Sequence, residues 1–125
     1  MTKTFEVTLS IKPRVKIHNP EKLVSFVCDR SSPFCQSFCT YSDINDFADS
    51  FLLQFHYEQK EFRKIGDDKN YAYYKFVEGY GRFKEVSHGK WVLVNEDTIN
   101  DMGLIEVFID NDGDLEVEWT STEVD

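Results

Sequence analysis

Apolar and polar residues alternate strictly near the start of the chain. Residues 5–11 place an apolar side chain at every second position, which is the period of a half-buried strand. Pro13 interrupts this pattern, because proline has no backbone N–H to donate to a sheet. The alternation resumes at Val15 and Ile17, so we expect a kinked strand that continues along the edge of a sheet.

The spacing of apolar residues then changes to three and four, which is the spacing of helices. Asn19-Pro20-Glu21 predicts a helix start, with asparagine as the cap, proline at the first helical position and an acid in the first turn. We expect this helix over residues 20–29. A second, short helix is expected to begin at Ser31-Ser32-Pro33 and to end near Cys39.

The strongest helical pattern covers residues 43–58. Phe47, Phe51 and Phe55 recur there at a spacing of four, with further apolar residues beside them. Ser42 is the expected N-cap, because its hydroxyl can accept a hydrogen bond from the first turn. We expect this helix to pack its aromatic stripe against a sheet.

From residue 71 onward the apolar spacing is again two, and glycine-containing turns separate the segments. The expected strands cover residues 71–77, 82–86, 90–94, 104–109 and 115–119. Gly79, Gly89 and Gly113 stand in turns where a positive φ is needed. Residues 95–103 are polar and have room for one helical turn.

Together these patterns predict an α+β fold: an N-terminal strand, two or three helices, then an antiparallel β-meander of about five strands. We expect residues 1–125 to form a single globular domain, because 125 residues suit one core. No stretch reaches the ~20 apolar residues of a membrane span. A charge follows the first residues too closely for an export signal, so we expect a cytoplasmic protein.

Acidic residues are unevenly distributed along the chain. The net charge is −9, yet residues 1–90 carry a small positive balance, and residues 91–125 contain eleven Asp or Glu and no Lys or Arg. In the two predicted strands of this region the apolar residues face inward and the acids outward, about 6.8 Å apart. The pattern therefore predicts a carboxylate-lined sheet face with one aromatic residue in its middle. Its members are Glu106, Phe108, Asp110, Asp112, Asp114, Glu116 and Glu118.

Such a face keeps a small protein soluble, or it docks on the basic groove with which another protein holds nucleic acid. The small, acidic and motif-free profile is similar to that of phage-borne inhibitors and toxin immunity proteins. We expect a non-enzymatic inhibitor that mimics nucleic acid and blocks a basic, nucleic-acid-handling defence protein of a host. The alternative is an immunity protein that neutralises a cognate toxin such as a nuclease. Direct binding of nucleic acid or of a membrane is not expected.

The turn sequence Asp110-Asn111-Asp112-Gly113-Asp114 suggests a calcium loop. With Gly113 at the sixth position of such a loop, Phe108 falls on the first ligand position, where it cannot coordinate a cation. A hairpin turn is the better interpretation of these residues.

Cys28, Cys35 and Cys39 are odd in number, which favours reduced thiols over a disulfide framework. They lack the Cys-x-x-Cys spacing of structural zinc sites, although His18 or His56 would complete a ligand set in space. No local context marks one of them as a nucleophile, so a small enzyme with a cysteine or carboxylate site is a further alternative. We expect packing roles, with no cofactor, metal or catalytic residue.

A run of tyrosines carries one more candidate interface. Tyr71, Tyr73, Tyr74 and Tyr80 lie near basic residues in the sequence, an arrangement that can stack on bases and meet phosphates. These basic residues are Lys69, Lys75, Arg82 and Lys84. The interpretation that we favour is simpler, because alternating residues of a strand point to opposite faces of a sheet.

Overall fold

The computed structural model describes residues 5–8, 12–64, 70–109 and 120–123. The elements in chain order are β1 (Phe5–Thr8), β2 (Pro13–Ile17), α1 (Pro20–Val27), α2 (Pro33–Ser37), α3 (Ile44–Tyr57), β3 (Glu61–Arg63), β4 (Ala72–Val77), β5 (Gly81–Ser87), β6 (Lys90–Leu93), α4 (Glu96–Met102), β7 (Ile105–Ile109) and β8 (Thr120–Glu123). None of the helices in this part of the chain is long and apolar enough to cross a membrane.

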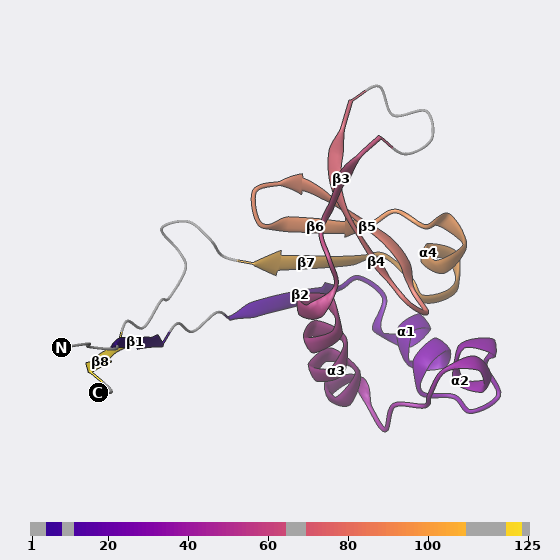
Figure 1. Cartoon of the computed structure of the whole chain (residues 1–125). Helices are drawn as coiled ribbons and strands as arrows, with labels where there is room; N and C mark the ends of the chain where they lie inside the picture. The colour runs from indigo at the N-terminus through magenta and orange to yellow at the C-terminus, as the bar shows by residue number, and fades with distance from the viewer. Residues whose placement is uncertain (1–4, 9–11, 65–69, 110–119, 124–125) are drawn as a thin grey trace.

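Six of these strands form one antiparallel sheet in the order β2-β7-β6-β5-β4-β3 (Figure 1). The expected α+β class is therefore confirmed, with the helices between an N-terminal strand and a meander. β1 and β8 pair with each other as a separate two-stranded sheet, which lies to one side of the main sheet in Figure 1. The N-terminal strand is thus two strands with different partners, rather than one kinked strand.

The expected hairpin between residues 104–109 and 115–119 is not the pairing that β7 makes. β7 has β2 on one side, with Val15 opposite Val107, and β6 on the other, with Trp91 opposite Val107. Residues 115–119 lie outside the described residues. The prediction paired strands that are consecutive in the chain. In the structure, the distant strand β2 pairs with β7 and forms the edge of the sheet.

The helices cover one face of the main sheet, and α3 supplies most of the aromatic contact. Phe47, Phe51 and Phe55 are at most 1% exposed. The Phe51 ring lies 5.2 Å from that of Tyr80 and 5.6 Å from that of Phe83, which comes from β5. Burial of these rings is the main stabilising term of the fold, because each removes a large apolar area from water.

The three helix starts follow the expected capping chemistry with one correction. The Asn19 side chain accepts from Lys22 N in α1, and Ser32 accepts from Cys35 N in α2. At α3 the cap is Asp43, whose carboxylate accepts from Asp46 N at 2.8 Å, so the expectation that Ser42 caps this helix is wrong. A carboxylate is favoured at this position because it also meets the positive end of the helix dipole.

One element was not expected from the pattern, and another is longer than expected. β3 consists of three exposed residues, too few to show a period, and it pairs with β4 at the far edge of the sheet. α4 fills residues 96–102, where one turn was expected, and its last residue Met102 is fully buried. Gly79, Gly81 and Gly89 have positive φ, which confirms the turn chemistry for two expected turns, while Gly113 lies outside the described residues.

Phe51 supplies the first testable prediction. We expect Phe51→Ala to lower the free energy of unfolding by about 3–5 kcal/mol, because the cavity would be lined by rings that cannot collapse into it. Phe51→Leu, which keeps most of the volume, should cost less than half as much. Urea denaturation followed by circular dichroism measures both values. A cost below about 1 kcal/mol for the alanine variant would contradict the packing described here.

The N-cap of α3 supplies the second testable prediction. Asp43→Ala should cost about 1 kcal/mol of stability, because it leaves a first-turn N–H without its acceptor. Ser42→Ala should cost clearly less, since the Ser42 hydroxyl contacts only the exposed Asp46 carboxylate. The same denaturation assay compares the two, and the reverse order would restore Ser42 as the cap.

Candidate functional site

Two of the seven residues predicted for the acidic sheet face lie on described parts of the chain. Ile105 and Val107 are fully buried against the helices, which leaves Glu106 and Phe108 on the outer face of β7, as the alternation predicted. The other five are Asp110, Asp112, Asp114, Glu116 and Glu118, and they lie outside the described residues.

Glu106 is held between two basic groups. Its Oε2 atom lies 2.8 Å from His18 Nε2, and its Oε1 atom lies 3.4 Å from Lys90 Nζ. The hydrogen bond from His18, followed by the charge of Lys90, lowers the pKa of the Glu106 carboxyl below its usual value. The charge of this carboxylate is therefore partly compensated within the fold.

The neighbouring strands make the outer face basic around β7. Lys16 on β2 lies opposite Glu106, and Arg14 on β2 and Lys90 on β6 lie on either side of Phe108. The Arg14 guanidinium carbon is 5.5 Å and Lys90 Nζ 5.8 Å from the centre of the Phe108 ring. The described part of this face is thus not the uniformly carboxylate-lined surface that the sequence predicted, because the sequence did not show that β2 would lie beside β7.

Charge is distributed unevenly between the strands of the main sheet and the helices. The strands β2 to β7 contain seven Lys or Arg and three Asp or Glu. Residues 20–58, which include α1, α2 and α3, contain six acids and two Lys or Arg, and residues 95–103 around α4 contain three acids and no Lys or Arg. Within the described residues, the helices therefore carry the negative charge and the strands the positive charge.

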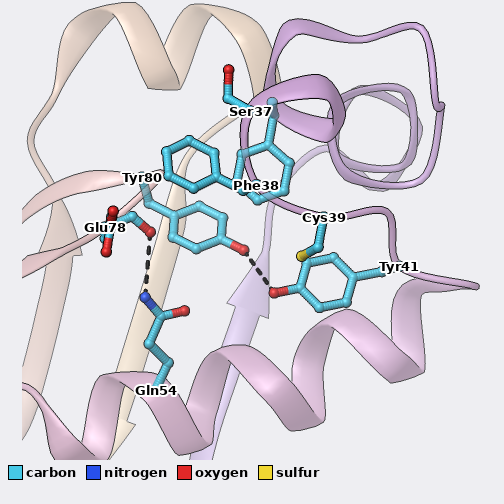
Figure 2. A pocket seen from close by; sticks show the side chains of 8 residues that line it. Ser37, Phe38, Cys39, Tyr41, Gln54, Glu78 and Tyr80 are labelled. Atoms are coloured by element: carbon cyan, nitrogen blue, oxygen red, sulfur yellow. Dashed lines mark hydrogen bonds between the residues drawn. The ribbon is translucent and has the colours of Figure 1, made fainter.

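A pocket of about 280 Å³ opens on the helix side, between α2, α3 and the turn from β4 to β5 (Figure 2). Four aromatic rings form its apolar walls, and they belong to Phe34, Phe38, Tyr41 and Tyr80. Phe34 and Tyr80 are buried, with ring centres 5.2 Å apart, whereas Phe38 is 50% exposed. The pocket thus has a buried aromatic floor and an accessible aromatic side.

The polar lining of the pocket comes from Ser37, Cys39, Gln54 and Glu78 together with the two tyrosine hydroxyls. The Tyr80 hydroxyl donates to the Tyr41 hydroxyl at 3.3 Å, and Gln54 Nε2 donates to the Glu78 carbonyl oxygen at 3.3 Å. Figure 2 shows Gln54 reaching up from α3 toward Glu78, below the ring of Tyr80. Burial raises the pKa of both phenols, so they are uncharged at neutral pH.

The sequence did not predict this pocket. Its residues come from three separate stretches, and Tyr41 and Tyr80 are 39 positions apart. The local pattern marked Tyr80 only as one of four alternating tyrosines. In the structure Tyr80 lies in the core, Tyr71 and Tyr73 contact Phe62 at the hairpin of β3 and β4, and the four do not form one surface.

The three cysteines are free thiols: Cys28 follows α1, Cys35 lies in α2 and Cys39 follows α2. Cys28 and Cys35 are half-buried, and Cys39 is exposed at the pocket. Burial, followed by the proximity of Cys35, raises the pKa of the Cys28 thiol, which disfavours the nucleophilic thiolate. Among the described residues, no group of three or more His, Cys, Asp or Glu side chains is arranged to hold a metal ion.

Lys75 is the one charged side chain of the described core. Its Nζ donates to the Phe55 carbonyl oxygen at 3.0 Å and lies 4.5 Å from the centre of the Phe55 ring. Burial, followed by repulsion from Lys60, lowers the pKa of this amine. Because Lys75 lies on β4 and hydrogen-bonds to the last turn of α3, it connects these two elements. Its burial therefore has a structural explanation.

Comparison of the chain with protein-family models, with curated proteins and with solved structures gives no match.

The ion pairs of Glu106 generate a pH prediction. A carboxyl with a lowered folded-state pKa stabilises the protein above its unfolded pKa, and this stability is lost as pH falls through the folded value. Wild type should therefore be more stable than Glu106→Gln at about pH 6, and the difference should vanish near about pH 2.5. Urea denaturation at both pH values measures it.

His18→Ala should raise the pKa of Glu106 toward its usual value, which carboxyl-detected NMR titration measures. Asp49→Asn is the control for the stability measurement, because Asp49 is an exposed acid of α3 far from Glu106 in the chain. An unchanged Glu106 titration in His18→Ala would assign the shift to Lys90 instead.

Proposed function

We propose that this protein acts by binding, and that it blocks a basic, nucleic-acid-handling protein. The observation that carries the proposal is that residues 20–58 and 95–103, which contain the helices, hold nine acids and two Lys or Arg, while the strands β2 to β7 hold seven of the fourteen Lys and Arg. A basic groove that binds phosphates attracts carboxylates by the same electrostatics. The helix side is therefore the surface that we assign to the partner.

The C-terminal acids add to this proposal. Residues 110–125 contain seven Asp or Glu and no Lys or Arg, which is the densest negative charge in the sequence. They include five of the seven residues predicted for the acidic face. We propose that these residues contribute a second anionic contact, which is tested separately from the helix side.

The outer sheet face around β7 is a less suitable contact for such a partner. Lys16 and Lys90 would approach the basic surface together with Glu106, and like charges across an interface cost binding energy. Glu106 would also have to exchange its two existing partners for a new one. We therefore do not include Glu106 in the proposed contact. Its existing ion pairs have a structural role.

The first experiment is a pull-down from host lysate with the tagged protein, eluted with a salt gradient and identified by mass spectrometry. A stoichiometric nucleic-acid-binding protein released by salt is the expected result. A defence protein as the target supports the anti-defence role, and a toxin encoded next to this gene supports the immunity role. Retention of no basic partner would contradict the proposal.

Charge reversal then locates the contact on the protein. With the identified partner, Asp49→Lys/Glu78→Lys should weaken binding by about tenfold or more, since two attractive charges become repulsive. Glu116→Lys/Glu118→Lys tests the C-terminal acids in the same way. Isothermal titration calorimetry measures each dissociation constant.

The control is Lys16→Glu, a charge reversal of the opposite sign on the outer face of the sheet. It should leave the affinity within about twofold or increase it. A large loss in Lys16→Glu together with unchanged binding of the helix-side variant would move the interface to the outer face.

A further inference from the structure

The aromatic pocket between α2 and α3 is suited to one kind of side chain. We propose that it receives an arginine side chain of the basic partner, with the guanidinium against the exposed ring of Phe38 and beside Glu78. This inference rests on the proposed function, because it names the group by which that partner is held. Three properties of the pocket carry it: its hydrogen-bonding capacity, its rings and its charge.

Several hydrogen-bond donors of the pocket are already used within it, and several acceptors remain available. Tyr80 donates to Tyr41, and Tyr41 hydrogen-bonds in turn to the Cys39 side chain. Gln54 donates one amide proton to the Glu78 backbone. The phenol oxygens, the Gln54 side-chain carbonyl and the Glu78 carboxylate keep acceptor capacity. A ligand that brings several donors matches this lining, and guanidinium brings five in one plane.

The rings supply the second property. The Phe34 ring centre lies 5.2 Å from that of Phe38 and 6.4 Å from that of Tyr41, so the rings form one connected wall. The face of an aromatic ring attracts a cation, and arginine also stacks on it because the guanidinium is planar. Phe38 is half exposed, and its apolar surface has no covering group among the described residues.

The third property is the negative charge of the pocket lining, which disfavours anionic ligands. Glu78 is the only charged residue in the lining, which contains no Lys, Arg or His among the described residues. Asp46 on α3 acts electrostatically on Tyr41 and so adds negative potential close by. A volume of about 280 Å³ accommodates a single long side chain rather than a cofactor.

The test uses the intact protein and a small probe, so that it does not depend on finding the partner. N-acetyl-arginine amide is titrated into ¹⁵N-labelled protein, and N-acetyl-citrulline amide, which has the same shape without the charge, is titrated in parallel. Saturable amide shifts at Phe38, Cys39 and Glu78 are expected with the arginine probe, with a dissociation constant on the order of millimolar. The citrulline probe should shift these amides much less.

Variants assign the binding to the named groups. Glu78→Gln and Phe38→Ala should each weaken binding of the arginine probe by about two- to fivefold, which corresponds to a loss of about 0.5–1 kcal/mol. Glu96→Gln, which removes the same charge on α4 outside the pocket, should leave the affinity unchanged. Equal shifts with both probes, or equal weakening in all three variants, would overturn the inference.

The outcome is separable from that of the pull-down. A basic partner that binds normally to Phe38→Ala would remove the pocket from the interface and leave the proposed function intact. Binding of the arginine probe without any basic partner in the lysate would retain the pocket and reject the proposed function.

Discussion

The fold depends on the aromatic stripe of α3. Phe47, Phe51 and Phe55 are the residues through which the helix side contacts the sheet, and their rings reach Tyr80, Phe83 and Trp91. This contact decides which face of the sheet is covered and which stays open. It also fixes the position of Tyr80, whose hydroxyl closes the inner end of the pocket. The candidate site is therefore a consequence of core packing, because Phe47 and Phe51 contact the Tyr80 ring that lines it.

Elements with a long, regular pattern could be predicted from the sequence, and their partners could not. The helix at residues 43–58 was expected within one residue of its bounds at either end, because its apolar spacing is sustained over four turns. β3 has three residues and no period, so it was missed. The pairing of β2 with β7 joins residues about ninety positions apart, and no local signal encodes such a contact. Tertiary packing decided these features.

The same limit explains the change in the candidate site. The alternation correctly placed Glu106 and Phe108 on one face of their strand, since a pleat needs only neighbouring residues. It did not show that His18, Arg14 and Lys90 would surround them, because those side chains come from β2, from the residue that follows it and from β6. Charges counted along the sequence give the correct total. When distant strands pair, however, the count does not show which charged side chains lie next to each other. The pocket was missed for the same reason.

The separation of charge across the sheet has a kinetic consequence. In the part of the chain that the structure describes, basic strands and acidic helices form a dipole that runs through the thickness of the domain. A positively charged surface would rotate this dipole during approach, so that productive orientations are sampled before contact. Association rates would then depend on ionic strength far more than the lifetime of the complex does. For the proposed basic partner, this orientation shortens the search when both proteins are scarce.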